Sequence, residues 1–335
     1  MNKIQVALLG LGTVGKGVYH HLHTHQRIIE RELGVSIEIA VIVVKHPEKH
    51  HDFAGEAILT SNFQVVLDNP KIAIVFEAII GKEPAFTYLT KSIQAGKHVI
   101  TANKEMFAYH GNELVKLANA NHVRVGYEAT TAGGIPIIQT LKQLFQVNQI
   151  RKITGILNGT SNYILTEMRE NRLSLDEALQ QAQYLGYAEE DPTNDIEGYD
   201  AFYKLMILCQ LLYDRQPEWT SVKRRGISAI TLEDILAQYS QGKRIKHLAS
   251  VEIIDNQIEA SVEPVALASN HPLFAIEGVD NAIVLEGDIV GKVTLSGPGA
   301  GSFPTASAMI EDLAIIIRSL KGSNEASRLI ESASN

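Results

Sequence analysis

The sequence predicts an α/β protein with two domains, a doubly wound parallel sheet followed by an α+β domain. Three observations support this fold class. Apolar runs alternate with helical stretches in the first third of the chain, a glycine-rich turn follows the first apolar run, and strand signals return near residue 245. The length of 335 residues also exceeds one ordinary core and suits about two domains.

The first 130 residues alternate between buried strands and helices. Nearly continuous apolar runs such as IQVALLG are typical of strands that are covered on both faces of a parallel sheet. The segment TANK is expected to be a loop. Consecutive βαβ units place such strands side by side. The expected strands lie at 4–10, 35–44, 71–79, in KHVI and at 123–129, and helices are expected up to about Leu33, at 84–96 and at 112–122.

The pattern changes after about residue 130. Helices are expected to dominate from Pro136 to about Gln241. Strands then follow between Ile245 and Gly297, and we expect an antiparallel meander with turns at 255–256 and near 288–291. A glycine-rich loop leads to a last helix over 302–320, and residues 321–335 are expected to form a polar tail.

Composition excludes several classes of protein. The net charge of −8 argues against a broad nucleic-acid-binding surface, and no run reaches the roughly 18 apolar residues of a membrane span. The N-terminus lacks the apolar region of a signal peptide, so a soluble cytoplasmic protein is expected. The single cysteine, Cys209, cannot form an internal disulfide and is expected to be buried in a helix.

Histidines are concentrated near the N-terminus, which raises the question of a metal site. His21 and His25 are four residues apart and would share one face of a helix. No carboxylate or cysteine at a familiar spacing completes a zinc site there. A solvated, histidine-rich surface is therefore expected.

A glycine motif follows the first strand and opens the first helix. Gly10 allows a tight turn, Gly12 lets the backbone approach a pyrophosphate, and Gly15 lets the helix pack closely on the strand. The helix N-terminus offers N–H groups to the anion. A glycine turn without a ligand is the alternative. We expect a Rossmann-type domain whose cofactor contacts include Gly10, Leu11, Gly12, Thr13, Val14 and Gly15.

The end of the second strand indicates which nicotinamide cofactor is used. An acidic residue there binds the ribose hydroxyls, whereas a basic one accommodates a 2′-phosphate. This strand ends with Lys45, His46 and Lys49, with no acid before Glu48. NADP(H) is therefore favoured. If Lys45 is only a solvated strand end, NAD(H) serves equally well.

Two lysines are candidates for chemistry. Lys104 follows a strand of the parallel sheet, where ligands bind, and its ammonium could hold a substrate oxygen; an exposed loop lysine is the alternative. Asp200 and Lys204 are four residues apart and would share one helical face. The carboxylate would keep Lys204 charged, so that it could pass a proton to an oxygen. The acids from Glu189 onward could bind an ammonium group, or form only a solvated acidic loop.

Six segments of the chain closely resemble homoserine dehydrogenase and occur in family order. They are GLGTVGKGV, TANKE, YEATTAGGIPII, ILNGTSNYILTEM, GYAEEDPTNDIEGYDAFYKL and GPGAGSFPTASAMIEDL, and they cover the chain from about Ile4 to Leu320. The resemblance implies NAD(P)-linked interconversion of L-homoserine and L-aspartate 4-semialdehyde, on the branch to threonine, isoleucine and methionine. It also implies a homodimer, with the strands between 245 and 297 as a candidate subunit interface.

The resemblance assigns roles to residues at matching positions. Lys204 matches the proton-transferring lysine, with Asp200 as its orienting partner, and Lys104 matches the second active-site lysine. Residues that match the substrate pocket are Glu189, Asp195 and Thr160. Further cofactor contacts are implied for Lys45, Ile80, Gly81, Thr101, Lys104, Gly186 and Gly301.

The segment YEATTAGGIPII is similar to a family loop that binds a structural alkali cation such as sodium. Its ligands would be Glu128 and the backbone carbonyls of Thr131, Gly133 and Ile135. An interdomain turn that needs glycine only for its shape is the alternative.

The family pattern also implies a division of the chain. Residues 1–130 and the helix 302–320 would form the dinucleotide-binding domain, and residues 131–301 the substrate-binding and dimerisation domain. Lys82 stands where many relatives have a second glycine, which leaves the cofactor preference open. A C-terminal regulatory domain, and feedback control by threonine through it, are not expected. The alternatives are a related amino-acid dehydrogenase and a catalytically silent NADP(H)-binding sensor.

Overall fold

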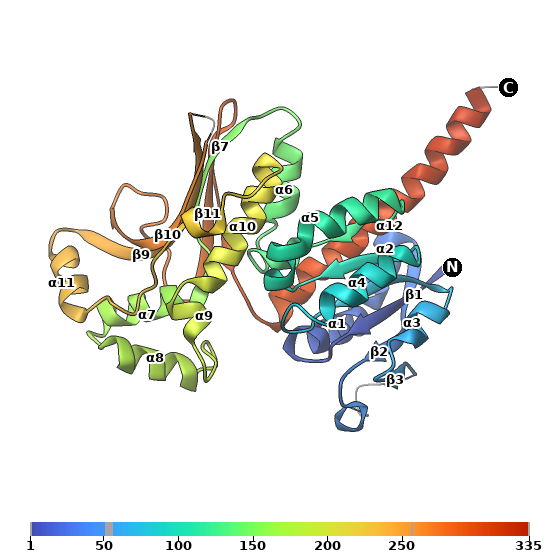
Figure 1. Ribbon diagram of the computed structural model, residues 1–335, viewed down its shortest axis with the longest axis horizontal. Coiled ribbons are helices and arrows are strands. Elements are labelled where there is room, and N and C mark those ends of the chain that lie inside the picture. Colours follow the sequence, from blue (N-terminus) through green and yellow to red (C-terminus); the bar gives the residue numbers. More distant parts are fainter. Residues whose placement is uncertain (1, 51–55, 256, 334–335) are drawn as a thin grey trace. The chain divides into compact units, whose positions relative to one another are not determined.

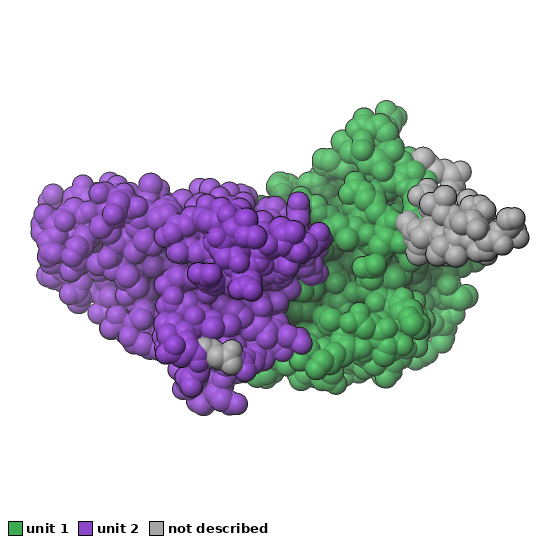
Figure 2. Space-filling model, turned by 90° about the horizontal axis from the view of Figure 1, so that it is seen from above, with its two compact units in different colours: residues 1–130, 301–335 green, residues 131–300 purple. Residues whose placement is uncertain are grey.

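The computed structural model describes residues 2–50, 56–255 and 257–333 (Figure 1). The chain divides into two compact units, coloured separately in Figure 2. Unit 1 combines Met1–Thr130 with Gly301–Asn335, and unit 2 is Thr131–Ala300. No helix within the described ranges has both the length and the apolar character needed to cross a membrane.

Unit 1 contains a parallel sheet with the strand order β3-β2-β1-β4-β5-β6. The order reverses between β1 and β4, as in Rossmann-type folds, and this confirms the predicted fold class. The short strand β3 was not expected from the sequence. The strands are β1 (Asn2–Leu9), β2 (Val35–Val43), β3 (Ile58–Thr60), β4 (Ile72–Glu77), β5 (His98–Thr101) and β6 (Val125–Gly126).

Helices cover both faces of this sheet (Figure 1). Those of unit 1 are α1 (Thr13–Thr24), α2 (Gln26–Leu33), α3 (Gln64–Asp68), α4 (Ala85–Gln94), α5 (Lys104–Ala120) and α12 (Ser302–Ala333), with 3-10 turns η1 (Pro47–Lys49) and η3 (Glu128–Thr130). The single helix expected up to Leu33 is broken at His25. The Thr24 hydroxyl donates to the His20 carbonyl (3.1 Å), and this kind of bond bends helices.

Two further helix boundaries differ from the prediction. TANK is not all loop, because α5 begins at Lys104. Asn103 caps this helix through its side chain, which accepts a hydrogen bond from the Met106 N–H (3.0 Å). The last helix does not end at Leu320 but continues to Ala333. The added stretch contains no proline, the residue that disfavours a helix most strongly.

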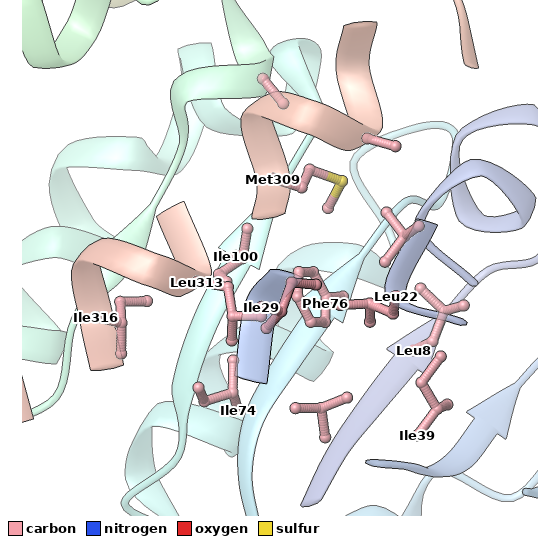
Figure 3. Close-up of a cluster of buried hydrophobic side chains, with 14 of the residues drawn as sticks. Leu8, Leu22, Ile29, Ile39, Ile74, Phe76, Ile100, Met309, Leu313 and Ile316 are labelled. Atoms are coloured by element: carbon pink, nitrogen blue, oxygen red, sulfur yellow. The ribbon is translucent and has the colours of Figure 1, made fainter. Parts of the chain in front are cut away.

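The C-terminal helix α12 completes the core of unit 1. Met309, Leu313 and Ile316 pack with Leu8 of β1 and Phe76 of β4 (Figure 3). Residues of α1 and α2 belong to the same cluster, so these three helices cover one face of the sheet. The last helix therefore shares a core with the first strand.

Unit 2 contains a second sheet with the strand order β12-β11-β7-β9-β10-β8. All described neighbours are antiparallel except β8 and β10. The predicted meander is wrong, because β7 lies between two hairpins, β9–β10 and β11–β12. The strands are β7 (Ile150–Ile156), β8 (Lys223–Arg224), β9 (Lys243–Ile254), β10 (Gln257–Ala268), β11 (Asp280–Gly287) and β12 (Gly291–Pro298).

The helices of unit 2 occupy most of the region where helices were expected. They are α6 (Ile137–Leu144), α7 (Gly159–Glu170), α8 (Leu175–Tyr184), α9 (Thr193–Ile196), α10 (Tyr199–Tyr213) and α11 (Leu232–Ser240), with the 3-10 turn η4 (Trp219–Ser221). Cys209 is buried in α10, and burial raises the pKa of its thiol to about 12. It is therefore a packing residue rather than a reactive thiol.

Unit 2 also buries a cluster of charges. The Lys246 ammonium lies 3.2 Å from Oε2 of Glu277. Arg169 and Arg244 contact Oε1 of the same carboxylate at 3.0 and 2.6 Å. Burial lowers the pKa of Lys246 to about 8, although Glu277 opposes the shift.

We expect alkali to stabilise the wild type relative to a Lys246→Met variant. The folded chain releases the Lys246 proton near pH 8, whereas the unfolded chain holds it to about 10.5. The unfolded state binds more protons across this window, so the free energy of unfolding contributed by Lys246 rises with pH. Urea denaturation of both proteins across the window measures the difference. A difference that stays constant with pH would contradict the low pKa of Lys246.

Candidate active site

A buried lysine and a carboxylate lie one turn apart at the start of α10. The Lys204 ammonium is 2.8 Å from Oδ2 of Asp200, and the side chains are only 8% and 4% exposed. Lys204 also donates to the Leu157 carbonyl at the end of β7 (2.6 Å). Both contacts are stronger than they would be in water, because the surroundings have a low dielectric constant.

Asn158 joins this pair to a second acid. Its side-chain amide donates to Oδ2 of Asp200 (2.8 Å) and to Oδ1 of Asp195 (2.7 Å). The side-chain oxygen Oδ1 of Asn158 accepts a hydrogen bond from the Ser161 N–H (2.7 Å), which makes Asn158 the N-cap of α7. Asn158 was not among the site residues predicted from the sequence. Its place directly before the Gly-Thr-Ser of ILNGTSNY, at a helix start, is the signal that could have found it.

A glycine lets the acidic loop enter α10. Gly198 has a φ of +78°, which favours glycine, and a side chain there would begin 2.9 Å from Cε1 of His247. His247 is buried, and burial lowers its pKa although Asp200 and the Arg225 carbonyl oppose the shift. The close packing beneath Gly198 fixes where α10 begins, and so where Asp200 and Lys204 lie.

The other predicted substrate residues differ in burial. Thr160 is buried, and its hydroxyl donates to the Tyr187 carbonyl (2.6 Å), which ties α7 to the acidic loop. Glu189 is exposed, and its backbone carbonyl accepts from Gln183 (3.1 Å). Gly186, in the same loop, has a φ of +76°. The structure thus brings Asp195, Asp200 and Lys204 together, while Glu189 lies on the surface.

The glycine turn of unit 1 has the geometry of a phosphate cradle. A side chain at Gly10 would begin 2.6 Å from the Ala78 carbonyl oxygen, and one at Gly15 would begin 2.1 Å from that of Gly10. No described atom lies within 4 Å of the same point at Gly12. Within the described residues, no side chain caps α1. Open space therefore meets the positive end of a helix, which fits a dinucleotide phosphate.

The remaining predicted cofactor residues of the turn differ in exposure. Leu11 is buried, Val14 is half-buried and Thr13 is exposed. The Thr13 carbonyl accepts from the Ser302 hydroxyl (2.9 Å) at the start of α12. Gly301, just before it, has a φ of +117°. This loop therefore ends beside the start of α1.

Two turns follow β4 and β5 at the same edge of the sheet. Ile80 is 92% exposed, and Gly81 has a φ of +86°. Thr101 is fully buried, so its side chain points into the protein, whereas Lys104 is half-buried at the first position of α5.

The basic residues expected near the cofactor also have defined places. Lys45 is exposed two residues after the end of β2. The Lys82 ammonium lies over the ring of Tyr109, 4.1 Å from its centroid. Its charge is therefore directed towards α5.

The predicted cation loop is buried and closely packed. Glu128 and Thr131 are buried, and Ile135 is 2% exposed. Gly133 has a φ of +58°, and a side chain there would begin 2.4 Å from the Gly299 carbonyl oxygen. Among residues 2–50, 56–255 and 257–333, no group of three or more His, Cys, Asp or Glu side chains is arranged to hold a metal ion.

We expect Asn158→Ala to cost more stability than loss of a helix cap alone. The variant loses the cap of α7 and both bonds to carboxylates, so the free energy of unfolding should fall by about 2 kcal/mol. Ser174→Ala, which removes the exposed cap of α8, is the matched control and should cost about 1 kcal/mol. Chemical denaturation measures both. Equal losses would mean that the Asn158 contacts with Asp195 and Asp200 contribute nothing.

Comparisons with known proteins agree over both units. One family model, homoserine dehydrogenase, NAD binding domain, matches residues 10–128, and a second, homoserine dehydrogenase, matches residues 136–314. The Bacillus subtilis homoserine dehydrogenase is 39% identical over 322 residues, which cover 96% of this chain and 74% of that protein. The NAD(+)-dependent homoserine dehydrogenase of Pseudomonas canavaninivorans is 35% identical over 338 residues, covering 93% and 96%.

A solved structure gives the same result. A homoserine dehydrogenase from Thiobacillus denitrificans matches with a TM-score of 0.92 and 42% identity, over 96% of this chain and 75% of that one. The alternatives of a silent sensor and of another amino-acid dehydrogenase are not favoured by these matches. The chain is therefore an NAD(P)-dependent oxidoreductase that acts on a CH–OH group, and it belongs to the homoserine dehydrogenase family.

Proposed function

We propose that this homoserine dehydrogenase uses Lys204 to exchange a proton with the oxygen that differs between L-homoserine and L-aspartate 4-semialdehyde. One observation carries the proposal: the Lys204 ammonium is buried and fixed between Asp200 and the Leu157 carbonyl. A general acid needs a defined position and a defined charge, and these two acceptors provide both.

The bound nicotinamide cofactor would supply or accept the hydride at the reacting carbon. The part of the protein is to hold the proton. Asp200 stabilises the charged form of Lys204, and Asn158 in turn orients the Asp200 carboxylate. In the reductive direction the ammonium donates a proton to the carbonyl oxygen as that oxygen becomes a hydroxyl. In the oxidative direction the neutral amine accepts it.

The two charged ends of the substrate need partners of opposite charge. We assign its ammonium group to Glu189 and Asp195, which lie on the loop and short helix before α10. Its carboxylate is assigned to Lys104 at the start of α5. Thr160 supports the acidic loop through the Tyr187 carbonyl. These contacts would orient the substrate and so lower the entropic part of the barrier.

The dinucleotide is assigned to the glycine turn at Gly10–Gly15 and to the turns that carry Ile80, Gly81, Thr101 and Lys104. NADP(H) is favoured over NAD(H), because the exposed Lys45 follows the end of β2 at Val43, where a 2′-phosphate would lie. The Pseudomonas canavaninivorans relative carries NAD(+) in its name, so the choice is open to measurement.

Four finer points are part of the proposal. A sodium-type cation would be bound by Glu128, Thr131, Gly133 and Ile135, in a loop where the close packing at Gly133 leaves no room for a side chain. The sheet of unit 2 would form a homodimer interface. The reaction would serve threonine, isoleucine and methionine synthesis, and a cytoplasmic location is expected from the sequence.

Lys204→Met should lower turnover of L-homoserine by about 1,000-fold, because the proton would have no positioned donor or acceptor. Absorbance at the reduced-nicotinamide band measures turnover, and fluorescence titration should show that NADPH binding is kept. Lys142→Met, which changes an exposed lysine of α6 in the same unit and outside the sheet, is the control. Turnover within about two-fold of the wild type would remove Lys204 from the mechanism.

Lys45→Asp should shift the enzyme from NADP towards NAD, changing the ratio of the two kcat/KM values by about 10-fold or more. The carboxylate repels a 2′-phosphate and can accept hydrogen bonds from ribose hydroxyls. Lys71→Asp makes the same change of charge just before β4, at the opposite edge of the sheet, and should leave the ratio unchanged. An unchanged ratio in Lys45→Asp would show that Lys45 does not select the cofactor.

A further inference from the structure

A fully buried carboxylate lies at the point where the strand order of unit 1 reverses. Glu77 is the last residue of β4 and is 0% exposed. Its neighbours in register are Leu9, which ends β1, and Thr101, which ends β5. In sheets of this topology ligands bind outside the carboxyl ends of the strands, at this reversal. Glu77 therefore lies beneath the predicted cofactor edge.

The carboxyl group of Glu77 connects two turns. Oε1 accepts from the Ile79 N–H (2.6 Å), in the turn that follows β4. Oε2 accepts from the Thr101 hydroxyl (2.5 Å), at the start of the turn that follows β5. The same two turns thus share one acceptor group.

Asn103 makes a second connection between the same turns. Its side-chain amide donates to the carbonyls of Ile79 (2.9 Å) and Gly81 (2.7 Å), while its own N–H donates to the Thr101 hydroxyl (3.0 Å). Asn103 is also the N-cap of α5, whose first residue is Lys104. The turn that carries Ile80 and the helix that carries Lys104 are therefore bound to one buried network.

Burying a carboxyl group at this position costs desolvation free energy. Phe76, which precedes Glu77 in β4, and Ile100, which precedes Thr101 in β5, are apolar and fully buried. Burial raises the pKa of Glu77 to about 7, and hydrogen bonds from Thr101, Ile79 and Asn103 oppose that shift. An apolar side chain would avoid the desolvation cost but could accept neither hydrogen bond.

We propose that Glu77 is a positioning residue, which holds the turn after β4 and the N-terminus of α5 in fixed relation and so sets the places of Ile80 and Lys104 at the cofactor. Glu77 acts through its partners, because its own side chain is enclosed. The inference rests on the proposed function to the extent that these two turns are taken to contact the nicotinamide cofactor.

Glu77→Gln tests the proposal with little change of shape. The glutamine carbonyl can still accept from Ile79, but the amide nitrogen cannot accept from the Thr101 hydroxyl. We expect the dissociation constant of NADPH, measured by its fluorescence, to rise by about 10-fold, with a matching rise in the KM of the cofactor. The same titration with NADH covers the other cofactor.

Lys97→Met separates positioning from a general loss of stability. Lys97 is also buried in unit 1, and its ammonium donates to the carbonyls of Asn69 (2.8 Å) and Ile72 (2.9 Å), at the opposite end of β4. This variant should lower the melting temperature but leave the NADPH dissociation constant unchanged. If Glu77 had only a structural role, Glu77→Gln would also lower the melting temperature and leave the NADPH dissociation constant unchanged.

A double-mutant cycle with Thr101→Val tests whether the shared hydrogen bond is responsible. Valine has the shape of threonine without its hydroxyl, and residue 101 is fully buried, so no direct contact of its side chain with the cofactor is lost. If both groups act through one bond, the double variant should bind NADPH within about two-fold of the weaker single variant. Additive losses would overturn the proposal.

The outcomes are distinct from those that test the enzyme's reaction. NADPH affinity within about two-fold of the wild type in folded Glu77→Gln overturns the positioning role. If Glu77→Gln does not fold, Thr101→Val decides by the same criterion. NADPH binding is read without substrate. A wild type that failed to oxidise L-homoserine would therefore refute the proposed function, while a weakened Glu77→Gln would still support the positioning role.

Discussion

The buried ion pair between Asp200 and Lys204 is the constraint on which unit 2 depends. Removing two charges from water costs several kcal/mol per ion, and only close, fully bonded contacts recover that cost. The structure provides a 2.8 Å contact, a backbone carbonyl for the ammonium and a side-chain amide for the carboxylate. These partners come from β7, the N-terminus of α7 and α10, so the placement of all three elements is tied to one pair of charges.

The two units prepare their sites by different means. In unit 1 the cradle depends on glycines that have no side chain. Gly10 and Gly15 allow backbone segments to approach so closely that no side chain would fit. The positive end of α1 then faces open space. In unit 2 the site is made by adding hydrogen bonds, through Asn158 and the acids around it. Backbone shape suits the phosphate proposed for unit 1, whereas the proton exchange proposed for Lys204 needs partners that fix its charge.

Local patterns in the sequence were reliable where no distant partner decides the outcome. The strands β1, β2, β4 and β5 are built around apolar segments such as VALL in β1 and IAIVF in β4, and such segments are typical of buried parallel strands. The spacing of Asp200 and Lys204 places them on one helical face regardless of the rest of the fold. Both features follow from the residue pattern within one strand or one helix.

Features that depend on distant segments could not be predicted in this way. β7 pairs with β11, where Thr154 is opposite Val284, and nothing local indicates that it separates two hairpins. Glu77 ends an ordinary apolar strand, and its importance comes from neighbours on β1 and β5. In the sequence Asn158 has only the features of a helix cap, and its bonds to Asp195 and Asp200 become visible only in the folded structure.

The sharing of a core between β1 and α12 has a consequence for how the chain is made. Met309, Leu313 and Ile316 cover apolar residues that leave the ribosome about 300 residues earlier. At ordinary synthesis rates, unit 1 waits on the order of 10 s for its last helix. During that time the whole of unit 2 is synthesised, while α1 and α2 cover their side of the sheet without the apolar residues of α12. The apolar core of unit 1 therefore cannot be completed until the C-terminal helix has been synthesised.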